Sequence, residues 1–243
     1  MTLFQLLIVA IIQGLTEFLP ISSSGHLALL PQVTGTQDQG LAIDVAVHLG
    51  TLLAVIIYFW QDVQVAIIGV FRLARGKIDT QGAFLALCLI VGTVPVLLVG
   101  LIIKLTGLDE LMRSVTVIGW TMLIFGLVLY WADRTGDTTK TSDRWTLKDA
   151  VIMGLAQCLA LIPGTSRSGI TITAARKLGY ERQGAAKLSM LMSIPVIIAS
   201  GAIESIEIIN SANWDLMRSA MFAAFFAFLA ALLALSIMMR LLR

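Results

Sequence analysis

The pattern of apolar positions divides the chain into long hydrophobic stretches separated by short polar segments. A helix that crosses a bilayer needs about 20 consecutive, mostly apolar residues. Five stretches come close to or exceed that length and consist mainly of Leu, Ile, Val, Ala, Phe, Gly and Met; they cover 43–60, 84–104, 115–131, 187–207 and 217–241. The pattern therefore predicts an all-α integral membrane protein with five transmembrane helices.

Two further apolar stretches are each broken by a proline and a run of small polar residues. The stretch 3–30 stops at Pro20 before a Ser-rich turn and resumes as a short helix, and the stretch 148–178 stops at Pro163 and resumes in the same way. Non-helical backbone at membrane depth is tolerated only where protein buries it or where it lines a wet cavity. We therefore predict two re-entrant helical hairpins that share an internal polar site.

The positions of Lys and Arg support this count, because these residues collect in cytoplasmic loops. With the N-terminus and the first hairpin placed outside, 13 of the 17 basic residues fall inside and only Arg167 lies within the membrane. The inside residues lie in 61–83, 132–148 and 176–187 and at Arg240 and Arg243, whereas the outside residues are Lys104, Arg113 and Arg218. Treating either hairpin as a full span would reverse every later loop and destroy this agreement.

In this topology the two hairpins enter the membrane from opposite sides, which is the arrangement of an inverted repeat. A weak echo relates 18–25 to 161–169, since both segments run through Pro into Ser and Gly. We expect one membrane domain, 1–243, with a first repeat at about 1–110 and a second at about 111–243. In such folds the half-helix N-termini near the midplane point their positive dipole ends at an anionic ligand.

The composition agrees with a membrane protein and excludes other classes. Hydrophobic residues make up 58% and charged residues 13% of the chain, with a mean hydropathy of +0.90, which is far from soluble-domain usage. The basic residues are scattered rather than clustered with aromatics, so a nucleic-acid partner is excluded. Cys88 and Cys158 lack metal-ligand spacing and are predicted to be buried thiols. The N-terminal stretch lacks a basic region and a cleavage site, so we expect it to be part of the mature structure.

Polar and ionisable side chains gather around the break in the first hairpin, where burial makes each of them expensive. They are Gln13, Glu17, Ser22, Ser23, Ser24 and His26. Gln13 and Glu17 are four residues apart and share one helix face. Ser23 and His26 are one helical turn apart, which suits a nucleophile and its base, and a nearby carboxylate would orient the imidazole.

The break in the second hairpin combines small residues, hydroxyls and one guanidinium. Glycine lets backbone approach a phosphate, the free N–H groups at a helix start bind it, and an arginine grips it with two prongs. We therefore predict an oxyanion cradle around Arg167. The predicted substrate contacts from both breaks are Ser22, Ser24, Gly164, Thr165, Ser166, Ser168, Gly169 and Thr171.

A purely structural interpretation competes with this one. In it the serines cap helices, Glu17 only neutralises Arg167, and His26 is a satisfied core residue. That interpretation is favoured for any single residue, but the whole set within fourteen positions favours chemistry. For Asp44 and His48, one turn apart at the start of the first span, we favour a structural or supporting role because both lie near the outer interface.

Three motifs carry a resemblance to a known family: QGLTEFLPISSSGH at 13–26, DVAVHLGTLLAV at 44–55 and PGTSRSGIT at 163–171. Together they resemble the undecaprenyl-diphosphatase, or bacitracin-resistance, family of bacteria, and the resemblance covers essentially the whole chain. It implies a multi-pass hydrolase of the bacterial inner membrane that converts undecaprenyl diphosphate into undecaprenyl phosphate, which recycles the lipid carrier for peptidoglycan synthesis. Members of the family continue beyond the position of Arg243 into one more spanning helix.

The resemblance also implies residue roles and a cofactor. Catalytic roles fall on Glu17, Ser23, His26 and Arg167, and Mg²⁺ or Ca²⁺ is expected to stimulate the reaction. Glu17 and Gln13 are the expected cation ligands, although many members carry a glutamate where this chain has Gln13. Undecaprenyl diphosphate and membrane lipid are the expected partners, and the sequence is compatible with a homodimer.

Several mechanisms and functions remain open at the level of the sequence. Ser23 attacks phosphorus with His26 as its base, or His26 is itself the nucleophile, or His26 is the base for direct attack by water. A polyprenyl-phosphate flippase or small-anion transporter is the alternative function, because inverted repeats with broken helices are typical of transporters. A structural membrane subunit is the third interpretation.

Overall fold

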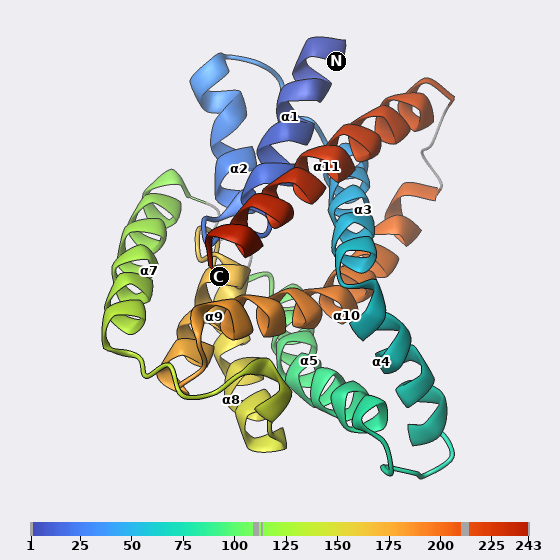
Figure 1. Ribbon diagram of the computed structural model, residues 1–243. Coiled ribbons are helices and arrows are strands. Elements are labelled where there is room, and N and C mark those ends of the chain that lie inside the picture. The colour runs from blue at the N-terminus through green and yellow to red at the C-terminus, as the bar shows by residue number, and fades with distance from the viewer. Residues whose placement is uncertain (1, 109–111, 113, 210–213, 243) are drawn as a thin grey trace.

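Every regular element of the computed structural model is helical (Figure 1). The structure describes residues 2–108, 112, 114–209 and 214–242, and their side chains except those of 206–209. Within these residues no strand forms, and the only β contact is an isolated bridge between Lys140 and Tyr180. The predicted all-α class is therefore confirmed, while the predicted positions of Arg113, Arg243 and 210–213 lie outside the described residues.

Within the described residues five helices are long and apolar enough to cross a membrane, as the hydrophobic pattern predicts. They are α3 (Leu41–Tyr58), α5 (Gln81–Thr106), α7 (Val115–Thr135), α10 (Arg182–Ile209) and α11 (Trp214–Leu241). Helices α5 and α10 start several residues before their apolar stretches, because a polar first turn can still be helical. At α5 the hydroxyl of Thr80 accepts a hydrogen bond from the amide of Ala83 and caps that turn.

The two broken stretches form pairs of short helices around their prolines. The first pair is α1 (Leu3–Thr16) and α2 (Ser23–Thr34), and the second is α8 (Leu147–Gln157), continued by the 3-10 turn η2 (Cys158–Leu161), and α9 (Arg167–Lys177). None of these α-helices exceeds 14 residues, which is too short to span a bilayer alone. Helix α2 runs past its predicted end at Leu30 and stops at Gly35, whose φ of +67° favours glycine.

One prediction about a connection is wrong, because the segment 61–83 is not only a loop. It contains α4 (Trp60–Leu73), and a second, minor element, η1 (Ser142–Arg144), lies between α7 and α8. Helix α4 packs along α5, where Gly69 leaves no room for a side chain against the backbone of Gly82. The apolar residues of α4 recur at helical spacing, but the helix is too short for a span and its last turn is basic. The charge pattern therefore predicts a cytoplasmic loop at this place and does not reveal the helix.

Helix α11 packs against both α1 and α3 and holds them together (Figure 1). Gly14 of α1 and Gly50 of α3 both lie against the backbone of α11, and neither position has space for a Cβ atom. A hydrophobic cluster that includes Phe18, Val55 and Leu235 fills the space between the first turn, α3, α10 and α11. This packing fixes the turn after α1 beside α3.

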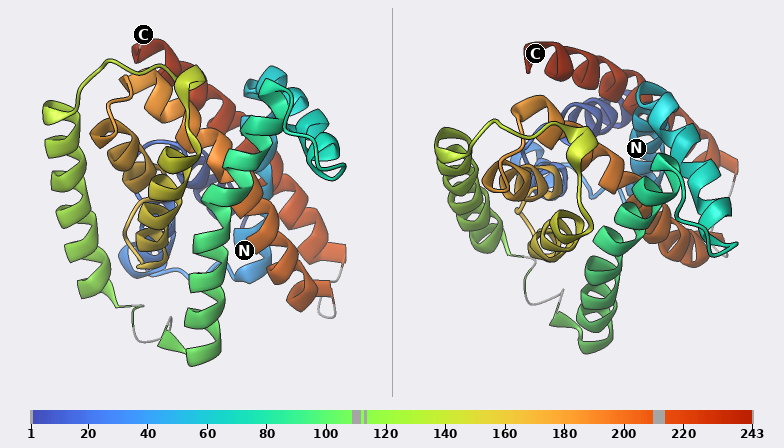
Figure 2. Two further views of the ribbon diagram at one scale, coloured as in Figure 1. Left: turned by 90° about the horizontal axis from the view of Figure 1, so that it is seen from below. Right: turned by 60° about the horizontal axis from the view of Figure 1, so that its bottom comes forward.

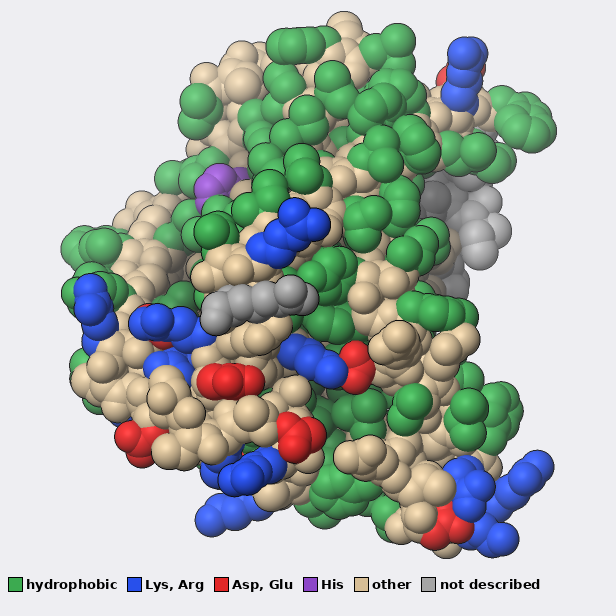
Figure 3. All heavy atoms as spheres, in the orientation of Figure 1, with side chains coloured by type: hydrophobic (Ala, Val, Ile, Leu, Met, Phe, Trp, Pro, Cys, Tyr) green, Lys and Arg blue, Asp and Glu red, His purple; other side chains and the backbone are tan. Residues whose placement is uncertain are grey.

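The two ends of the helix bundle differ in charge. In the left view of Figure 2 the C-terminal ends of α5 and α10 lie at one end, and the α7–α8 connection and the C-terminus lie at the other. On the face drawn in Figure 3 most Lys and Arg side chains lie in the lower half, where α4, α8 and the start of α10 are found. Several of them are paired there, including Lys187 with Asp62 at 2.7 Å and Arg72 with Asp79.

Arg176 anchors this basic end although its side chain is only 2% exposed. Its guanidinium donates to a carboxylate oxygen and the carbonyl of Asp133, and to the carbonyls of Gly136, Asp137 and Tyr180. These carbonyls include groups left free at the end of α7, which a cation stabilises. Burial and the adjacent Asp149 raise the pKa of the Tyr180 phenol well above its ordinary value, so the phenol stays protonated and donates to Asp149.

We expect Arg176→Ala to lower the free energy of unfolding by about 3–5 kcal/mol, because it leaves the carbonyls of Asp133, Gly136, Asp137 and Tyr180 without their donor. Arg182→Ala is the matched control, since Arg182 binds the same Asp133 with a side chain that is 53% exposed. Such an exposed pair contributes at most about 1 kcal/mol. Thermal unfolding in detergent measures both variants, and equal shifts would contradict the anchoring role.

Candidate functional site

The turns of the two short-helix pairs meet at one buried carboxylate. Glu17 directly follows α1, and its Oε1 accepts from Nη2 of Arg167 at 2.7 Å. Its Oε2 accepts from Oγ of Ser23 at 2.7 Å and from Nε2 of Gln13 at 3.0 Å. The structure thus brings together four of the predicted site residues from segments that lie about 150 positions apart in sequence. Both oxygens of Glu17 therefore accept hydrogen bonds.

The two turns are built alike. Ser22 caps α2 by accepting from the amide of Gly25, and Ser166 caps α9 by accepting from the amide of Gly169. The capping hydroxyls also contact the hydroxyls two residues on, Ser24 and Ser168, at 3.2 and 3.0 Å. The serines therefore cap helices, as the structural interpretation holds. Ser23 and Arg167 then occupy the same position, the first residue of each helix.

Close backbone contacts join the turns to each other and to α7. The hydroxyl of Ser168 donates to the carbonyl of Leu19 at 2.8 Å, and the hydroxyl of Thr121 on α7 donates to the carbonyl of Pro163 at 2.6 Å. Gly164 has a φ of +91°, and a Cβ atom there would collide with Thr121. The lack of a side chain at Gly164 is thus already needed for packing on α7, in addition to any approach of a phosphate.

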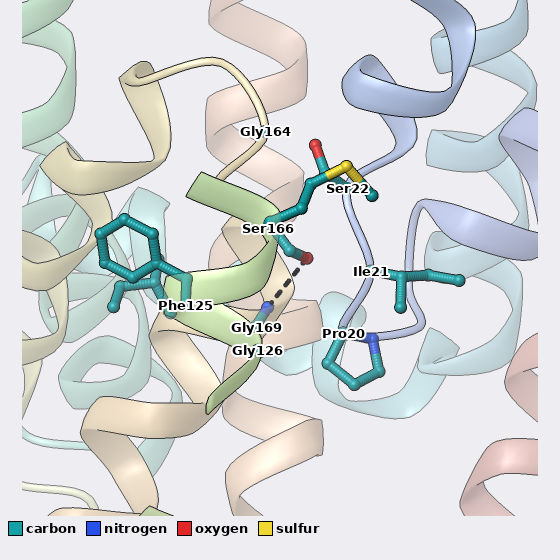
Figure 4. A pocket seen from close by; sticks show the side chains of 10 residues that line it. Pro20, Ile21, Ser22, Phe125, Gly126, Gly164, Ser166 and Gly169 are labelled. Carbon is teal, nitrogen blue, oxygen red and sulfur yellow. Dashed lines mark hydrogen bonds between the residues drawn. The ribbon is translucent and has the colours of Figure 1, made fainter. Parts of the chain in front are cut away.

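A pocket of about 90 Å³ opens where the turns face α7 (Figure 4). Its wall from the first turn is Pro20, Ile21 and Ser22, and its wall from α7 is apolar. The second turn contributes Gly164, Ser166, Gly169 and Ile170, and α7 contributes Met122, Phe125 and Gly126. Figure 4 shows Ser166 on the opposite side of this space from Ile21 and Pro20. The pocket joins hydroxyl groups to a hydrophobic wall.

Three polar atoms at this site are buried without a hydrogen-bond partner among the described residues. They are Nη1 of Arg167, Oγ1 of Thr165 and Oε1 of Gln13. Buried polar groups are normally satisfied, so such atoms indicate a missing ligand or water. Arg167 and Thr165 offer donors beside the start of α9, which is the chemistry that binds an oxyanion.

His26 is oriented by backbone rather than by a carboxylate. Its Nδ1 lies 2.6 Å from the carbonyl oxygen of Ser22, and because a carbonyl can only accept, Nδ1 carries the proton. The Nε2 atom of the neutral ring is then free to accept a proton. In the described part of the chain the hydroxyl of Ser23 donates to Glu17 and not to His26. The imidazole in turn is bonded to the carbonyl of Ser22 and not to Glu17, so neither of the two expected contacts of His26 is formed.

Thr171 lies one turn into α9 and away from the tip. Its hydroxyl contacts Oγ of Ser189 at 2.6 Å and the carbonyls of Arg167 and Ser168. Ser189, on α10, is fully buried, and no sequence signal distinguishes it from other small residues of that helix. Thr171 therefore supports α9 from behind in this structure.

Comparison with known proteins decides the family. The family model described as "Bacitracin resistance protein BacA" matches residues 6–243. This chain belongs to the BacA family. Proteins named undecaprenyl-diphosphatase from Roseobacter denitrificans, Dinoroseobacter shibae and a Jannaschia species are 72%, 66% and 61% identical to it over 243 residues. Each alignment covers 100% of this chain and 91% of the relative.

In this BacA family protein His48 reaches the site, although the sequence favoured only a supporting role. Its Nε2 lies 3.8 Å from Oε2 of Glu17, and its Nδ1 lies 2.7 Å from the carbonyl oxygen of Asp44. The four-residue spacing of Asp44 and His48 indicates that the two residues share one face of a helix. It does not reveal that this face lies against the first turn, because that depends on how α3 packs.

The predicted cation ligands of this BacA family protein are adjacent but already bonded to each other. Gln13 donates to Glu17, and the guanidinium of Arg167 occupies the other carboxylate oxygen. Among the described residues no three His, Cys, Asp or Glu side chains gather in one place as an all-protein metal site. Oε1 of Gln13 is the one protein oxygen of this pair without a partner.

Proposed function

We propose that this chain hydrolyses undecaprenyl diphosphate to undecaprenyl phosphate and phosphate, and so recycles the lipid carrier for peptidoglycan synthesis. The names of its relatives support the substrate. The observation that carries the proposal is the pair of buried, unpartnered donors on Arg167 and Thr165 beside the facing helix starts. A diphosphate would supply the acceptors that these donors lack.

The chain is a multi-pass membrane protein, since its family is a membrane family and five of its helices are long and apolar. The finer topology is part of the proposal: α1–α2 and α8–α9 are re-entrant hairpins of an inverted repeat. The matching caps at Ser22 and Ser166 and the equivalent positions of Ser23 and Arg167 support this repeat. The tips would then lie inside the membrane, where burial sharpens their electrostatics.

For the chemistry we infer that Ser23 is the nucleophile and Glu17 its base. The hydroxyl of Ser23 already donates to Oε2 of Glu17 at 2.7 Å, which is the geometry required to pass its proton as Oγ attacks the terminal phosphorus. Arg167 and the amides at the helix starts hold the developing negative charge. His26, through its free Nε2, then takes a proton from the water that releases phosphate.

This assignment changes the expected base from His26 to Glu17 and keeps His26 as the alternative nucleophile. The apolar wall of the pocket formed by Met122 and Phe125 is suited to the first units of the prenyl chain. The remainder of the chain would lie in lipid between the spanning helices. A homodimer is not needed for any of these steps.

The test of the function is phosphate release from undecaprenyl diphosphate by the purified protein in detergent, with and without a chelator. Steady release is the expected result. A flippase would instead move the lipid across liposome membranes without releasing phosphate, and a structural subunit would do neither. Either of those outcomes would overturn the proposal.

We further propose that a divalent cation acts with the substrate, held by diphosphate oxygens and by Oε1 of Gln13 rather than by Glu17 alone. Gln13 has a free oxygen, whereas both oxygens of Glu17 are engaged. Bound in this way, Mg²⁺ or Ca²⁺ would neutralise phosphate charge. Both ions prefer hard oxygen ligands, which diphosphate and amide oxygens provide.

We expect Gln13→Glu to preserve or raise turnover in saturating Mg²⁺ or Ca²⁺ and to make it more sensitive to a chelator. A second carboxylate beside Glu17 strengthens cation binding, but without a cation the two like charges repel. Phosphate release against cation concentration compares the variant with its parent. An unchanged cation response would place the ion away from Gln13.

We propose that the N-terminus lies outside and the basic end of the bundle inside, in the bacterial inner membrane. In a background without Cys88 and Cys158, a cysteine at Val33 should react with a membrane-impermeant reagent from outside. Cysteines at Ile78, Thr138 and Lys177 should react only from inside, because these positions lie in the basic connections. Labelling of Val33 and Lys177 from one side would contradict the inverted hairpins.

A further inference from the structure

His48 faces the same carboxylate oxygen that accepts the proton of Ser23. Its Nδ1 is bonded to the carbonyl of Asp44, so that nitrogen carries a proton and Nε2 is the atom that gains or loses one. Nε2 lies 3.8 Å from Oε2 of Glu17, and Oγ of Ser23 lies 2.7 Å from that same oxygen. A proton received by Oε2 therefore has an acceptor 3.8 Å away, a separation that a small movement of the ring or one bridging water would close.

Behind His48 lies a second pocket, separate from the one beside α7. It has a volume of about 70 Å³ and lies between α3 and α10. Its lining is Val45, His48, Leu49, Ile197, Ser200, Gly201 and Glu204. This volume accommodates several waters, since one needs only about 10–15 Å³ of such space. The imidazole, 34% exposed, thus lies between the buried carboxylate and a polar space large enough for water.

The charged groups that face His48 come from three elements. Glu17 lies on one side of the ring, Glu204 of α10 lines the pocket on the other, and Asp44 lies one turn back on α3. Arg167 of α9 is paired with the other oxygen of Glu17. The imidazole therefore has one carboxylate inside the site and another in the pocket behind it.

We propose that His48 is the residue that removes the catalytic proton from Glu17 and passes it to water in the pocket beside Glu204. This inference rests on the proposed phosphatase function. As Oγ of Ser23 bonds to phosphorus, its proton moves to Oε2 of Glu17, and the broken P–O bond leaves its electron pair on the lipid phosphate. Nε2 of His48 then accepts the proton with its lone pair, which returns Glu17 to the carboxylate. His48 acts through Glu17 and is a positioning and proton-transfer residue.

The test compares His48→Ala with His48→Gln in the full chain, using undecaprenyl diphosphate as substrate. We expect kcat to fall about 100-fold in both, the lower end of the effect of a positioned proton-transfer group, while KM changes little. Added imidazole should restore His48→Ala, because the deletion enlarges the adjacent pocket, and the restored rate should increase with the fraction of neutral imidazole. It should not restore His48→Gln, whose side chain still fills the space.

Leu53→Ala is the control, since Leu53 lies on the same helix, is 51% exposed and lines neither of the two pockets. It should keep parental kcat in the presence and absence of imidazole. A near-parental kcat in His48→Ala, or a loss that imidazole does not relieve, would overturn the role of His48. Failure of the parent protein to release phosphate would instead overturn the proposed function, so the two failures are distinct.

Discussion

Arg167→Lys is expected to lower kcat for phosphate release by about 100- to 1,000-fold although the positive charge is kept. The two terminal nitrogens of the guanidinium have different roles. Nη2 is bound to Glu17 at 2.7 Å, whereas Nη1 is buried without a partner among the described residues and is the donor for phosphate. An ammonium is a point charge on a flexible stem and cannot hold both the carboxylate and a phosphate oxygen in a fixed plane. The loss should therefore appear in kcat as well as in KM.

The matched control is Arg182→Lys, which changes an exposed arginine bound in two-pronged fashion to Asp133 at the basic end of the bundle. It should retain parental turnover. Both variants should be compared with the parent by thermal unfolding, because loss of the Glu17 partner also leaves a buried carboxylate less well paired. Near-parental turnover in a folded Arg167→Lys protein would contradict the oxyanion cradle.

The long helices and the positions of the breaks could be predicted from the sequence because their causes are local. Apolar length alone marks α3, α5, α7, α10 and α11, and Pro20 and Pro163 interrupt backbone hydrogen bonding wherever the chain lies. Helix α4 was missed because its 14 residues fall between the length of a loop and that of a span. Its packing on α5 depends on the contact of Gly69 with Gly82, which no periodicity contains.

The types of functional group at the two breaks could be predicted from the sequence, but the hydrogen-bond partners of these groups could not. Hydroxyl, carboxylate, imidazole and guanidinium groups within two short motifs indicate a polar site, and the contact of Glu17 with Arg167 was one of the two interpretations offered by the sequence. The choice of Glu17 rather than His26 as the partner of Ser23 depends on the turn at Ser22, whose carbonyl captures the imidazole. Spacing along a helix cannot reveal such competition from the backbone.

The position of His48 shows the same limit at longer range. Its distance from Glu17 is set by how closely α1 and α3 approach α11, and that approach depends on Gly14 and Gly50 meeting the α11 backbone. These glycines lie within apolar helices and carry no sign of their partner in the local sequence. From the sequence His48 is expected in solvent near the membrane surface, whereas in the folded structure it lies beside Glu17.

Substitutions at Ser23 and His26 separate the two candidate nucleophiles. Ser23→Ala should reduce turnover by about 10⁴-fold or more, because it removes the attacking oxygen that Glu17 holds at 2.7 Å. His26→Ala should also abolish most turnover, by about 10²- to 10⁴-fold, because no base remains for the water that releases phosphate. The exposed Ser219, which only bonds the carbonyl of Asp215 on α11, provides the control Ser219→Ala with parental activity.

The covalent intermediate tells the two mechanisms apart when both variants are inactive. With substrate radiolabelled in its terminal phosphate and a rapid quench in detergent at neutral pH, His26→Ala should accumulate label on the protein that survives later acid treatment as phosphoserine, because attack proceeds and hydrolysis stalls. Ser23→Ala should retain none. If Ser23→Ala instead keeps full activity, or if its label is acid-labile as phosphohistidine is, then His26 is the nucleophile, and the hydrogen bond from Ser23 to Glu17 only positions the carboxylate.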